Sequence, residues 1–161
     1  MRFQTYFSPI GPLLLASDGQ YLTEIKINPQ NITQQTFRTD AILEATTDWL
    51  DQYFLGNEQN AFNLPLRPTG TPFQLRVWQH ILLVPYGHTI SYGEIAAKIA
   101  RELNIEKMSS QAVGRAVGAN PLPIVIPCHR VLGTNGKLVG YSDGLARKIY
   151  LLDLEKAKYK K

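Results

Sequence analysis

The 161-residue sequence predicts an α+β fold, in which a small antiparallel β-sheet with one helix precedes a mostly helical part that contains a helix-turn-helix. Apolar runs separated by turn signals fill the first 27 residues, and helical periodicity dominates after residue 72. Between them, residues 64–72 carry three prolines and a glycine, which disfavour a helix or a central strand. We therefore predict two domains, residues 1–66 and residues 67–161, in a chain long enough to bury two small cores.

The first domain is predicted to contain three strands and one helix. The extended runs are residues 3–7, 13–16 and 21–27. Asp18-Gly19, between the last two runs, is a strong hairpin signal. From Asp40 to Gly56 the apolar residues recur at helical spacing. They are Ile42, Leu43, Trp49, Leu50, Tyr53 and Phe54. We find no constellation of catalytic side chains in this domain.

Three helices are predicted between residues 72 and 118. The first covers residues 72–83 and ends before the Pro-Tyr-Gly run at residues 85–87. Ser91 is expected to cap the second, because Ser91 and Glu94 fit the capping-box pattern. The third covers residues 110–117 and is closed by a glycine.

The second and third of these helices have the pattern of a helix-turn-helix. Ala112, Gly114 and Ala116 would let the third helix press its backbone into a nucleic-acid groove. Gln111 and Arg115, four residues apart, would project from one face as polar side chains. The same small residues would equally let two helices of one protein pack closely, so both interpretations stay open.

A turn and a last helix are predicted near the C-terminus. Residues 134–137, Thr-Asn-Gly-Lys, form a hairpin signal between the apolar pairs 131–132 and 138–139. Ser142 or Asp143 is expected to cap the helix. Its apolar positions are Leu145, Ile149 and Leu152. Glu155 lies in the last turn, where the helix dipole disfavours an acid, so we expect it to have a partner, and His129 is one candidate.

The net charge of +4 combines two parts of opposite sign. Residues 1–66 hold three basic and seven acidic side chains, a net −4, whereas residues 67–161 hold fourteen basic and six acidic ones, a net +8. The positive part favours a polyanionic partner, because neutralisation of phosphates is the main sequence-independent source of nucleic-acid affinity. A solvated basic surface with a lysine-rich tail is the alternative.

Cys128 is the only cysteine of the chain and lies in the run Ile124–Arg130, IVIPCHR. One sulfur can form neither an intramolecular disulfide nor the cysteine-rich cage of a structural zinc site. Cys128 is therefore either a packed thiol or a nucleophile. The apolar β-type run ahead of it would give a rigid base, and the neighbouring His129 and Arg130 would favour a thiolate.

The sequence contains no secretory signal, and no apolar run approaches the length of a membrane span. We expect a cytoplasmic protein that does not bind membranes, in a compartment where a lone thiol stays reduced. His80 and His88 lack acidic or sulfur neighbours in the sequence, so we interpret them as structural residues. Arg130 is interpreted as structural or phosphate-facing.

Motifs in a fixed order run from residue 70 to residue 155. They are Gly70–Gln74 (GTPFQ), Val77-Trp78, Val84–Ala96 (VPYGHTISYGEIA), Ala112-Val113-Gly114, Asn120-Pro121, Ile126–Val131 (IPCHRV), Gly140-Tyr141-Ser142, and Leu151-Leu152 with Glu155. Together they resemble the O6-alkylguanine-DNA alkyltransferase family, to which residues 1–66 are similar only in their strand-helix layout. The resemblance implies a ribonuclease H-like first domain and a winged-helix-like second domain.

The resemblance also implies DNA repair in a single turnover. An alkyl group would move irreversibly from O6 of guanine, and less readily from O4 of thymine, in duplex DNA to Cys128. Displacement at a saturated carbon by sulfur gives a thioether, which has no easy hydrolytic exit. We expect a monomer without a cofactor or a metal ion. The N-terminal zinc cluster of some relatives has no counterpart, since residues 1–66 contain neither cysteine nor histidine.

The catalytic roles that the resemblance implies fall on four residues. His129, through a water, would take the proton of Cys128, and Glu155 would orient and charge-stabilise the imidazole. Tyr92 would give a proton to N3 of the leaving guanine.

Other residues of the resemblance would hold the base. The carbonyls of Cys128 and Val131, together with Ser142, would bind its edge, and Tyr141 belongs to the same pocket. Asn120 would brace the turn that shapes the pocket. The nucleotide must be flipped out of the duplex, because its O6 atom is inaccessible in the stack.

The third helix would enter the minor groove, with Gln111, Ala112, Gly114 and Arg115 against the DNA. Two positions depart from the family. Many relatives carry an arginine where this chain has Gln111, and that arginine fills the gap left by the flipped base, so we expect weaker support for flipping unless Arg115 compensates. Glycine is common at the position of Asp143, so the added volume and charge predict poorer acceptance of bulky groups such as benzyl.

Two other classes of function are weighed against this one. A lesion sensor that binds DNA without chemistry would carry another residue, often tryptophan, at the position of Cys128. A Cys/His hydrolase usually has its nucleophile and base far apart in the sequence, unlike the adjacent Cys128 and His129. The number of methyl groups accepted per chain distinguishes the three.

Overall fold

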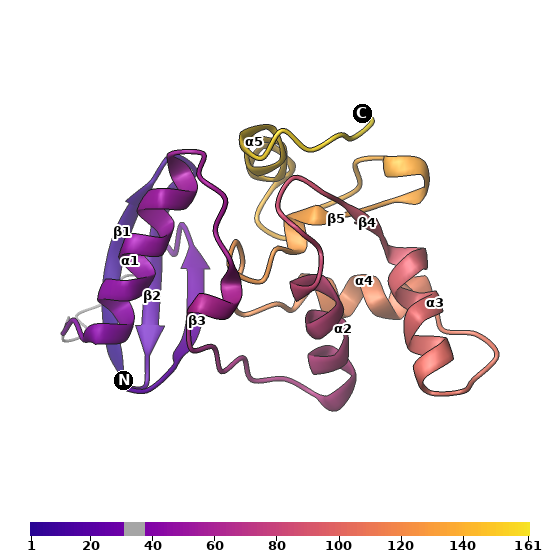
Figure 1. Cartoon of the computed structure of the whole chain (residues 1–161), viewed down its shortest axis with the longest axis horizontal. Coiled ribbons are helices and arrows are strands. Elements are labelled where there is room, and N and C mark those ends of the chain that lie inside the picture. Colours follow the sequence, from indigo (N-terminus) through magenta and orange to yellow (C-terminus); the bar gives the residue numbers. More distant parts are fainter. Residues whose placement is uncertain (31–37) are drawn as a thin grey trace. The chain divides into compact units, whose positions relative to one another are not determined.

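The computed structural model describes residues 1–30 and 38–161 (Figure 1). This part of the chain forms two compact units. The first consists of Met1–Thr69 and Pro121–Val125, and the second of Gly70–Asn120 and Ile126–Lys161. The chain thus leaves the second unit for a short segment, in which the carbonyl of Pro121 accepts a 2.9 Å hydrogen bond from the N–H of Ile25. All residues that we predict to form the site belong to the second unit.

The first unit is a three-stranded antiparallel sheet with a helix along one face (Figure 1). Its elements are β1 (Arg2–Ser8), β2 (Gly11–Ser17), β3 (Leu22–Ile27), α1 (Ala41–Phe54) and the 3-10 helix η1 (Ala61–Asn63). The side chain of Asp40 caps α1 by accepting from the N–H of Leu43, which explains why the helical pattern begins there. Leu13 and Leu15 of the sheet and Leu50 of α1 are fully buried, so the core lies between the sheet and the helix.

The second unit begins with three packed helices, α2 (Pro72–Leu82), α3 (Tyr92–Glu102) and α4 (Ser110–Gly118). Their bounds agree closely with the predicted ones, and α3 and α4 pack against each other as the predicted helix-turn-helix. Oγ of Ser91 accepts from the N–H of Glu94, which is the first half of the predicted capping box. A complete box, with both hydrogen bonds, occurs at Thr71 and Gln74.

Trp78 joins α2 to α4. Its indole N–H donates to the carbonyl of Ala116 at 2.8 Å, and its side chain is buried. A Cβ atom on Gly70 would lie 2.5 Å from the indole ring, so only glycine fits at this position. The Gly70 and Trp78 motifs are therefore two sides of one packing contact.

The predicted hairpin near residue 135 is wrong in its pairing. The strand β5 (Val131–Leu132) pairs in parallel with β4 (Ile90–Ser91), and the N–H of Leu138 donates to the carbonyl of Lys160 instead. Thr134–Gly136 forms the short 3-10 helix η3, with Asn135 in the left-handed region at φ 59°. The turn signal was local and is real, whereas the pairing depends on distant segments that compete for the same backbone groups.

The last helix, α5 (Leu145–Leu154), differs from the prediction in its cap and in its buried face. Its N-cap is Gly144, at φ 100°, and no side chain of Ser142 or Asp143 caps it. Leu145 is 44% exposed. The buried face consists of Lys148, Leu151, Leu152 and Glu155. Of the predicted apolar positions, Leu152 is buried and Ile149 is half-buried, so only Leu145 lies off the buried face. The charged Lys148 and Glu155 occupy places on that face that an apolar pattern does not indicate.

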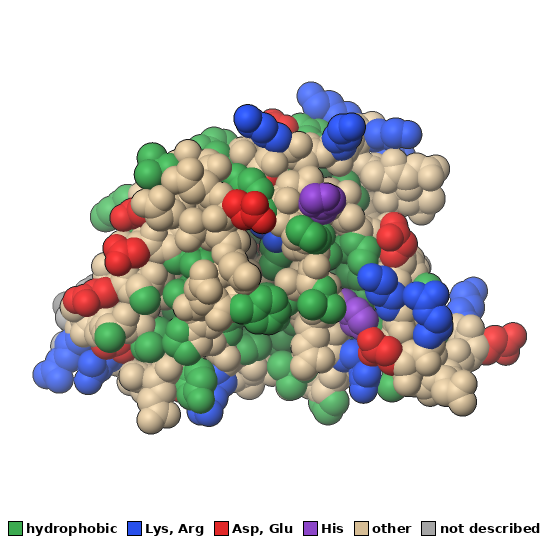
Figure 2. Space-filling view, viewed as in Figure 1, with side chains coloured by type: hydrophobic (Ala, Val, Ile, Leu, Met, Phe, Trp, Pro, Cys, Tyr) green, Lys and Arg blue, Asp and Glu red, His purple; other side chains and the backbone are tan. Residues whose placement is uncertain are grey.

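Figure 2 shows Lys and Arg side chains gathered over α3 and near the C-terminus of the second unit, consistent with the net +8 of residues 67–161. His80, although it has no acidic neighbour in the sequence, lies 2.6 Å from the carboxylate of Glu102. Among the described residues, no helix has the length and apolar character needed to span a membrane. No group of three or more His, Cys, Asp or Glu in residues 1–30 and 38–161 could hold a metal ion.

Candidate active site

Cys128 is the first residue of the 3-10 helix η2 (Cys128–Arg130) and is 4% exposed. The predicted β-type run before it is not a strand, and Ile124 has a left-handed backbone at φ 74°. Prolines at positions 121, 123 and 127 remove the N–H donors that a strand would need. The side-chain amide of Asn120 instead donates to the carbonyl of Ile126 at 2.8 Å, so it braces the turn that leads to Cys128.

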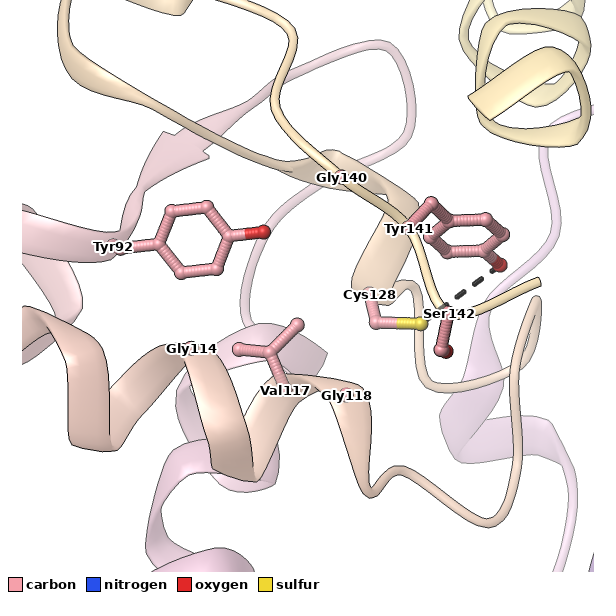
Figure 3. A pocket seen from close by; sticks show the side chains of 8 residues that line it. All are labelled: Tyr92, Gly114, Val117, Gly118, Cys128, Gly140, Tyr141 and Ser142. Carbon is pink, nitrogen blue, oxygen red and sulfur yellow. Dashed lines mark hydrogen bonds between the residues drawn. The ribbon is translucent and has the colours of Figure 1, made fainter. Parts of the chain in front are cut away.

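Cys128 lines a cavity of about 250 Å³ in the second unit (Figure 3). The walls come from the first residue of α3, from α4, from η2 and from the segment 140–142. The lining residues are Tyr92, Gly114, Val117, Gly118, Cys128, Gly140, Tyr141 and Ser142. The hydroxyl of Tyr141 is 3.9 Å from Sγ of Cys128, and the hydroxyl of Tyr92 points into the cavity from the other side (Figure 3). Five of the predicted site residues are therefore brought together here.

The environment of Cys128 keeps its thiol protonated at rest. Burial raises the thiol pKa, and the charge of Asp143 raises it further. Hydrogen bonds with Asn120 and Tyr141 and the charge of Lys148 act in the opposite direction, but burial outweighs them. A nucleophile at this position consequently needs a base that removes its proton when the substrate is bound.

His129 and Glu155 form a fully buried pair. Nε2 of His129 lies 2.6 Å from Oε2 of Glu155, and neither side chain is exposed. Burial lowers the pKa of His129 in spite of the nearby carboxylate, so the imidazole is neutral at pH 7. Because its Nε2–H donates to Glu155, Nδ1 is the ring nitrogen that can accept a proton.

Arg130 is the second partner of Glu155. Its Nε donates to Oε1 of Glu155 at 2.8 Å, and its terminal nitrogen donates to the carbonyl of Val84 at 2.8 Å. The backbone N–H of Gly87 adds a 3.1 Å hydrogen bond to the same carboxylate oxygen. Burial raises the pKa of Glu155, but the hydrogen bonds and charges of His129 and Arg130 outweigh it and hold the pKa well below its usual range.

Arg130 is thus a structural residue, and it faces a buried carboxylate rather than a phosphate. His129 and Arg130 are adjacent in η2, and both contact the carboxylate of Glu155. Lys148 was missed altogether. It lies three residues before the buried Leu151, on the stripe that ends at Glu155, and this helical spacing could have revealed it.

Tyr92 begins α3 and lines the cavity. Burial and the charge that Cys128 carries as a thiolate both raise the pKa of Tyr92 above 10. The phenol therefore keeps its proton at neutral pH and can donate it. This is the protonation state that a general acid requires.

The groups that are predicted to bind the base differ in their exposure to solvent. Ser142 is exposed at the cavity wall, whereas Val131 is fully buried. The carbonyl of Val131 accepts from Nζ of Lys148 at 2.7 Å, and that of Cys128 accepts from the N–H of Val131. Each carbonyl oxygen has a second lone pair for a base edge.

The predicted DNA-contacting residues lie on α4. Gln111 and Arg115 are exposed there, while Ala112 and Gly114 are half-buried. Gly114 and Tyr92 also line a second cavity of about 470 Å³ between the first turns of α3 and α4 and residues 133–139. Asp143 is half-buried but is not among the residues that line the cavity at Cys128. Its added volume therefore does not fill that cavity, and its charge is the effect that remains.

The fold and the site together define an α+β protein with a cysteine at the wall of a cavity, a buried His-Glu pair whose histidine follows that cysteine in the sequence, and a helix-turn-helix that contributes to the same wall. Two family models match the chain: the ribonuclease-like domain of 6-O-methylguanine DNA methyltransferase over residues 1–68, and the DNA binding domain of the same protein over residues 72–157. The chain belongs to the 6-O-methylguanine DNA methyltransferase family.

Individual relatives match over nearly the whole chain. The methylated-DNA--protein-cysteine methyltransferase of Mycobacterium tuberculosis strain H37Rv is 43% identical over 163 residues, which cover 98% of this chain and 94% of the relative. The protein of the same name from Methanosarcina acetivorans is 39% identical and covers 96% of this chain and 98% of its own length. The crystal structure of Mycobacterium tuberculosis OGT in complex with DNA matches with a TM-score of 0.81 and 41% identity, covering 97% of this chain and 93% of that one.

Proposed function

We propose that this chain repairs alkylated DNA by transferring an alkyl group from O6 of guanine, and less readily from O4 of thymine, in duplex DNA to Sγ of Cys128. The observation that carries the proposal is the joint position of Cys128 and Tyr92 on one cavity, together with the buried pair that His129, the residue after the cysteine, forms with Glu155. The relatives named above, one of them crystallised with DNA, support duplex DNA as the partner.

In the proposed reaction, the proton of the Cys128 thiol moves through a water to Nδ1 of His129. The charge of Glu155 stabilises the imidazolium that forms. The electron pair of the thiolate then forms the bond to the alkyl carbon while the bond between that carbon and O6 breaks. The electron pair of the broken bond stays on O6 of the leaving base.

Tyr92 protonates the leaving base at N3 and is reprotonated from the imidazolium, through solvent. The net change is one S–C bond formed, one C–O bond broken, and the thiol proton transferred to guanine. The product is a neutral thioether, which is a poor leaving group, so no hydrolysis restores the thiol. Each chain therefore reacts once.

The alkylated nucleotide leaves the stack to reach Cys128, and α4 follows the minor groove. Gly114 of α4 lines both cavities and has no side chain, so the backbone of α4 can approach the DNA closely, which supports this placement. The basic second unit supplies attraction to phosphates at any sequence. We infer that the protein acts on DNA as a monomer in the cytoplasm.

The test is a titration of the protein with duplex DNA that contains one O6-methylguanine, with an undamaged duplex of the same sequence as the control. We expect loss of the lesion to stop at one methyl group per chain. Repeated turnover would indicate a hydrolytic enzyme, and tight binding without transfer would indicate a lesion sensor. Either result would contradict the proposal.

A further inference from the structure

Lys148 of α5 is a fully buried lysine whose partners are backbone carbonyls. Its Nζ donates to the carbonyl oxygens of Val131 at 2.7 Å, Val139 at 3.1 Å and Gly140 at 3.3 Å. In the part of the chain that the structure describes, none of the ion pairs within 4.0 Å involves Lys148. Lysine is almost never fully buried without a carboxylate, because the loss of hydration is costly.

The three carbonyls belong to two segments that meet at the cavity. Val131 begins β5 and lies three residues after Cys128, so it belongs to the segment that carries the nucleophile. Val139 and Gly140 directly precede Tyr141 and Ser142, which line the cavity. The ammonium group therefore joins the segment that carries the nucleophile to the segment that forms the facing wall.

The wall needs such a tie, because residues 139–143 form neither a helix nor a strand. Val139 is 38% exposed, and a Cβ atom on Gly140 would meet nothing within 4 Å. The same wall places the hydroxyl of Tyr141 3.9 Å from Sγ of Cys128, and the ring of Tyr141 lies 6.0 Å from Nζ of Lys148. A shift of this segment would move Tyr141 and Ser142 relative to the sulfur.

We propose that Lys148 is a positioning residue for alkyl transfer, whose ammonium group ties the wall of residues 139–142 to β5 and so holds Tyr141 and Ser142 against Cys128. This inference rests on the proposed function. The charge of Lys148 has a second effect, because a cation near the sulfur lowers the pKa of the Cys128 thiol. Burial lowers the pKa of Lys148 itself to about 8, so most of the ammonium keeps its charge at neutral pH.

Two variants separate the hydrogen bonds of Lys148 from its packing. Lys148→Met keeps the length of the side chain without a donor, and Lys148→Gln keeps two N–H donors without a charge. Lys158→Met, at an exposed lysine of the same C-terminal segment, is the matched control. The readouts are the limiting rate of methyl transfer at saturating DNA, the DNA concentration at half saturation, the melting temperature, and the hydrogen exchange of the Tyr141 and Ser142 amides.

We expect the limiting rate to fall by about 100-fold in Lys148→Met and by about 10-fold in Lys148→Gln, since small misplacements at a reacting centre have effects of this size. The DNA concentration at half saturation should stay within about twofold, because α4 is untouched. The amides of Tyr141 and Ser142 should exchange faster in Lys148→Met. The control should match the native protein in every readout.

A limiting rate in Lys148→Gln within about twofold of the native value would overturn the proposal, even if Lys148→Met does not fold. So would a loss confined to DNA affinity, or an equal loss in the Lys158→Met control. Failure of the proposed function is a separate outcome: a native protein that transfers no methyl group would contradict that function. Amide exchange in Lys148→Met would still test the tie, because it needs no substrate.

Discussion

Oε2 of Glu155 lies 2.6 Å from Nε2 of His129, and both side chains are inaccessible to solvent. The other oxygen of the same carboxylate accepts hydrogen bonds from Arg130 at 2.8 Å and from the backbone of Gly87 at 3.1 Å. One acid thus connects η2, the turn after α2 and the end of α5. The imidazole beside Cys128 is held by a contact between residues 26 positions apart in the sequence.

Replacement of Glu155 should therefore affect both stability and chemistry. In Glu155→Gln the guanidinium of Arg130 stays buried without its countercharge, so we expect the free energy of unfolding to fall by about 3 kcal/mol. The methyl-transfer rate should fall by about 100-fold, because the imidazolium loses its stabilising charge. Urea unfolding and single-turnover kinetics measure the two effects.

The matched control is Glu106→Gln, at an exposed acid of the same unit. Its free energy of unfolding should stay within about 0.5 kcal/mol of the native value. If Glu155→Gln is equally harmless, the carboxylate does not hold the site together.

Acid should destabilise the protein in two adjoining ranges of pH. The pKa of His129 is lowered in the folded state, so below its unfolded value of about 6.5 the unfolded chain binds the proton first and stability falls. The pKa of Glu155 is also lowered, so its contribution is complete above its unfolded value of about 4.3 and is lost as the pH falls toward the folded one.

Unfolding free energies of the native protein and of Glu155→Gln, measured at roughly pH 7.5, 5.5 and 3.5, test these signs. The difference in unfolding free energy between the two proteins should become smaller at the lowest pH, because Glu155 is then partly protonated in the unfolded chain. A difference that is constant over the whole range would show that the coupled titration of Glu155 is absent.

Gln111→Arg should strengthen DNA binding and raise the repair rate. Gln111 is exposed on α4, where a guanidinium could stack in the gap left by the flipped base and also contact phosphate. We expect about a tenfold gain in affinity for lesion-containing duplex at fixed salt, measured by fluorescence anisotropy, and a faster methyl transfer.

Gln79→Arg adds the same charge at an exposed position of α2 and controls for nonspecific attraction. It should raise the affinity for damaged and undamaged duplex alike, without a faster transfer. Unchanged affinity and repair rate in Gln111→Arg would contradict the hypothesis that the glutamine weakens base flipping.

Asp143 should slow the reaction through its charge. The carboxylate raises the pKa of the Cys128 thiol but does not line the cavity, so Asp143→Asn and Asp143→Gly should both react faster with free O6-benzylguanine, by about three- to tenfold. The rate of inactivation by that base measures the effect. A gain in Asp143→Gly alone would point to side-chain volume instead, and no gain in either variant would rule out both reasons.

The sequence predicted those parts of the fold that depend on near neighbours. Helix α2 is an example, because a proline at its first position, a polar cap and an apolar stripe lie within twelve residues. The three strands of the first unit and the start of α1 at Asp40 follow from similarly local signals. The order of the motifs around Cys128 also indicated the family.

Contacts between distant segments could not be read from the sequence. The pairing of β5 with β4 rather than with residues 138–139 depends on which backbone groups compete for a partner. Ile124 has a left-handed backbone conformation, which β-branched residues rarely adopt, so nothing in the local sequence predicts it. The helical spacing of Lys148 indicates the buried face of α5, but its hydrogen bonds with the carbonyls of the cavity wall depend on how α5 packs, which the sequence does not show.

The most direct test of the central claim is to locate the methyl group after reaction with an O6-methylguanine duplex. Peptide mass spectrometry of the native protein should find one methyl group per chain, on the peptide that contains Cys128. Cys128→Ser should bind the same duplex but remain unmodified, with the lesion intact. A methyl group on another residue, or loss of the lesion by the serine variant, would contradict the account.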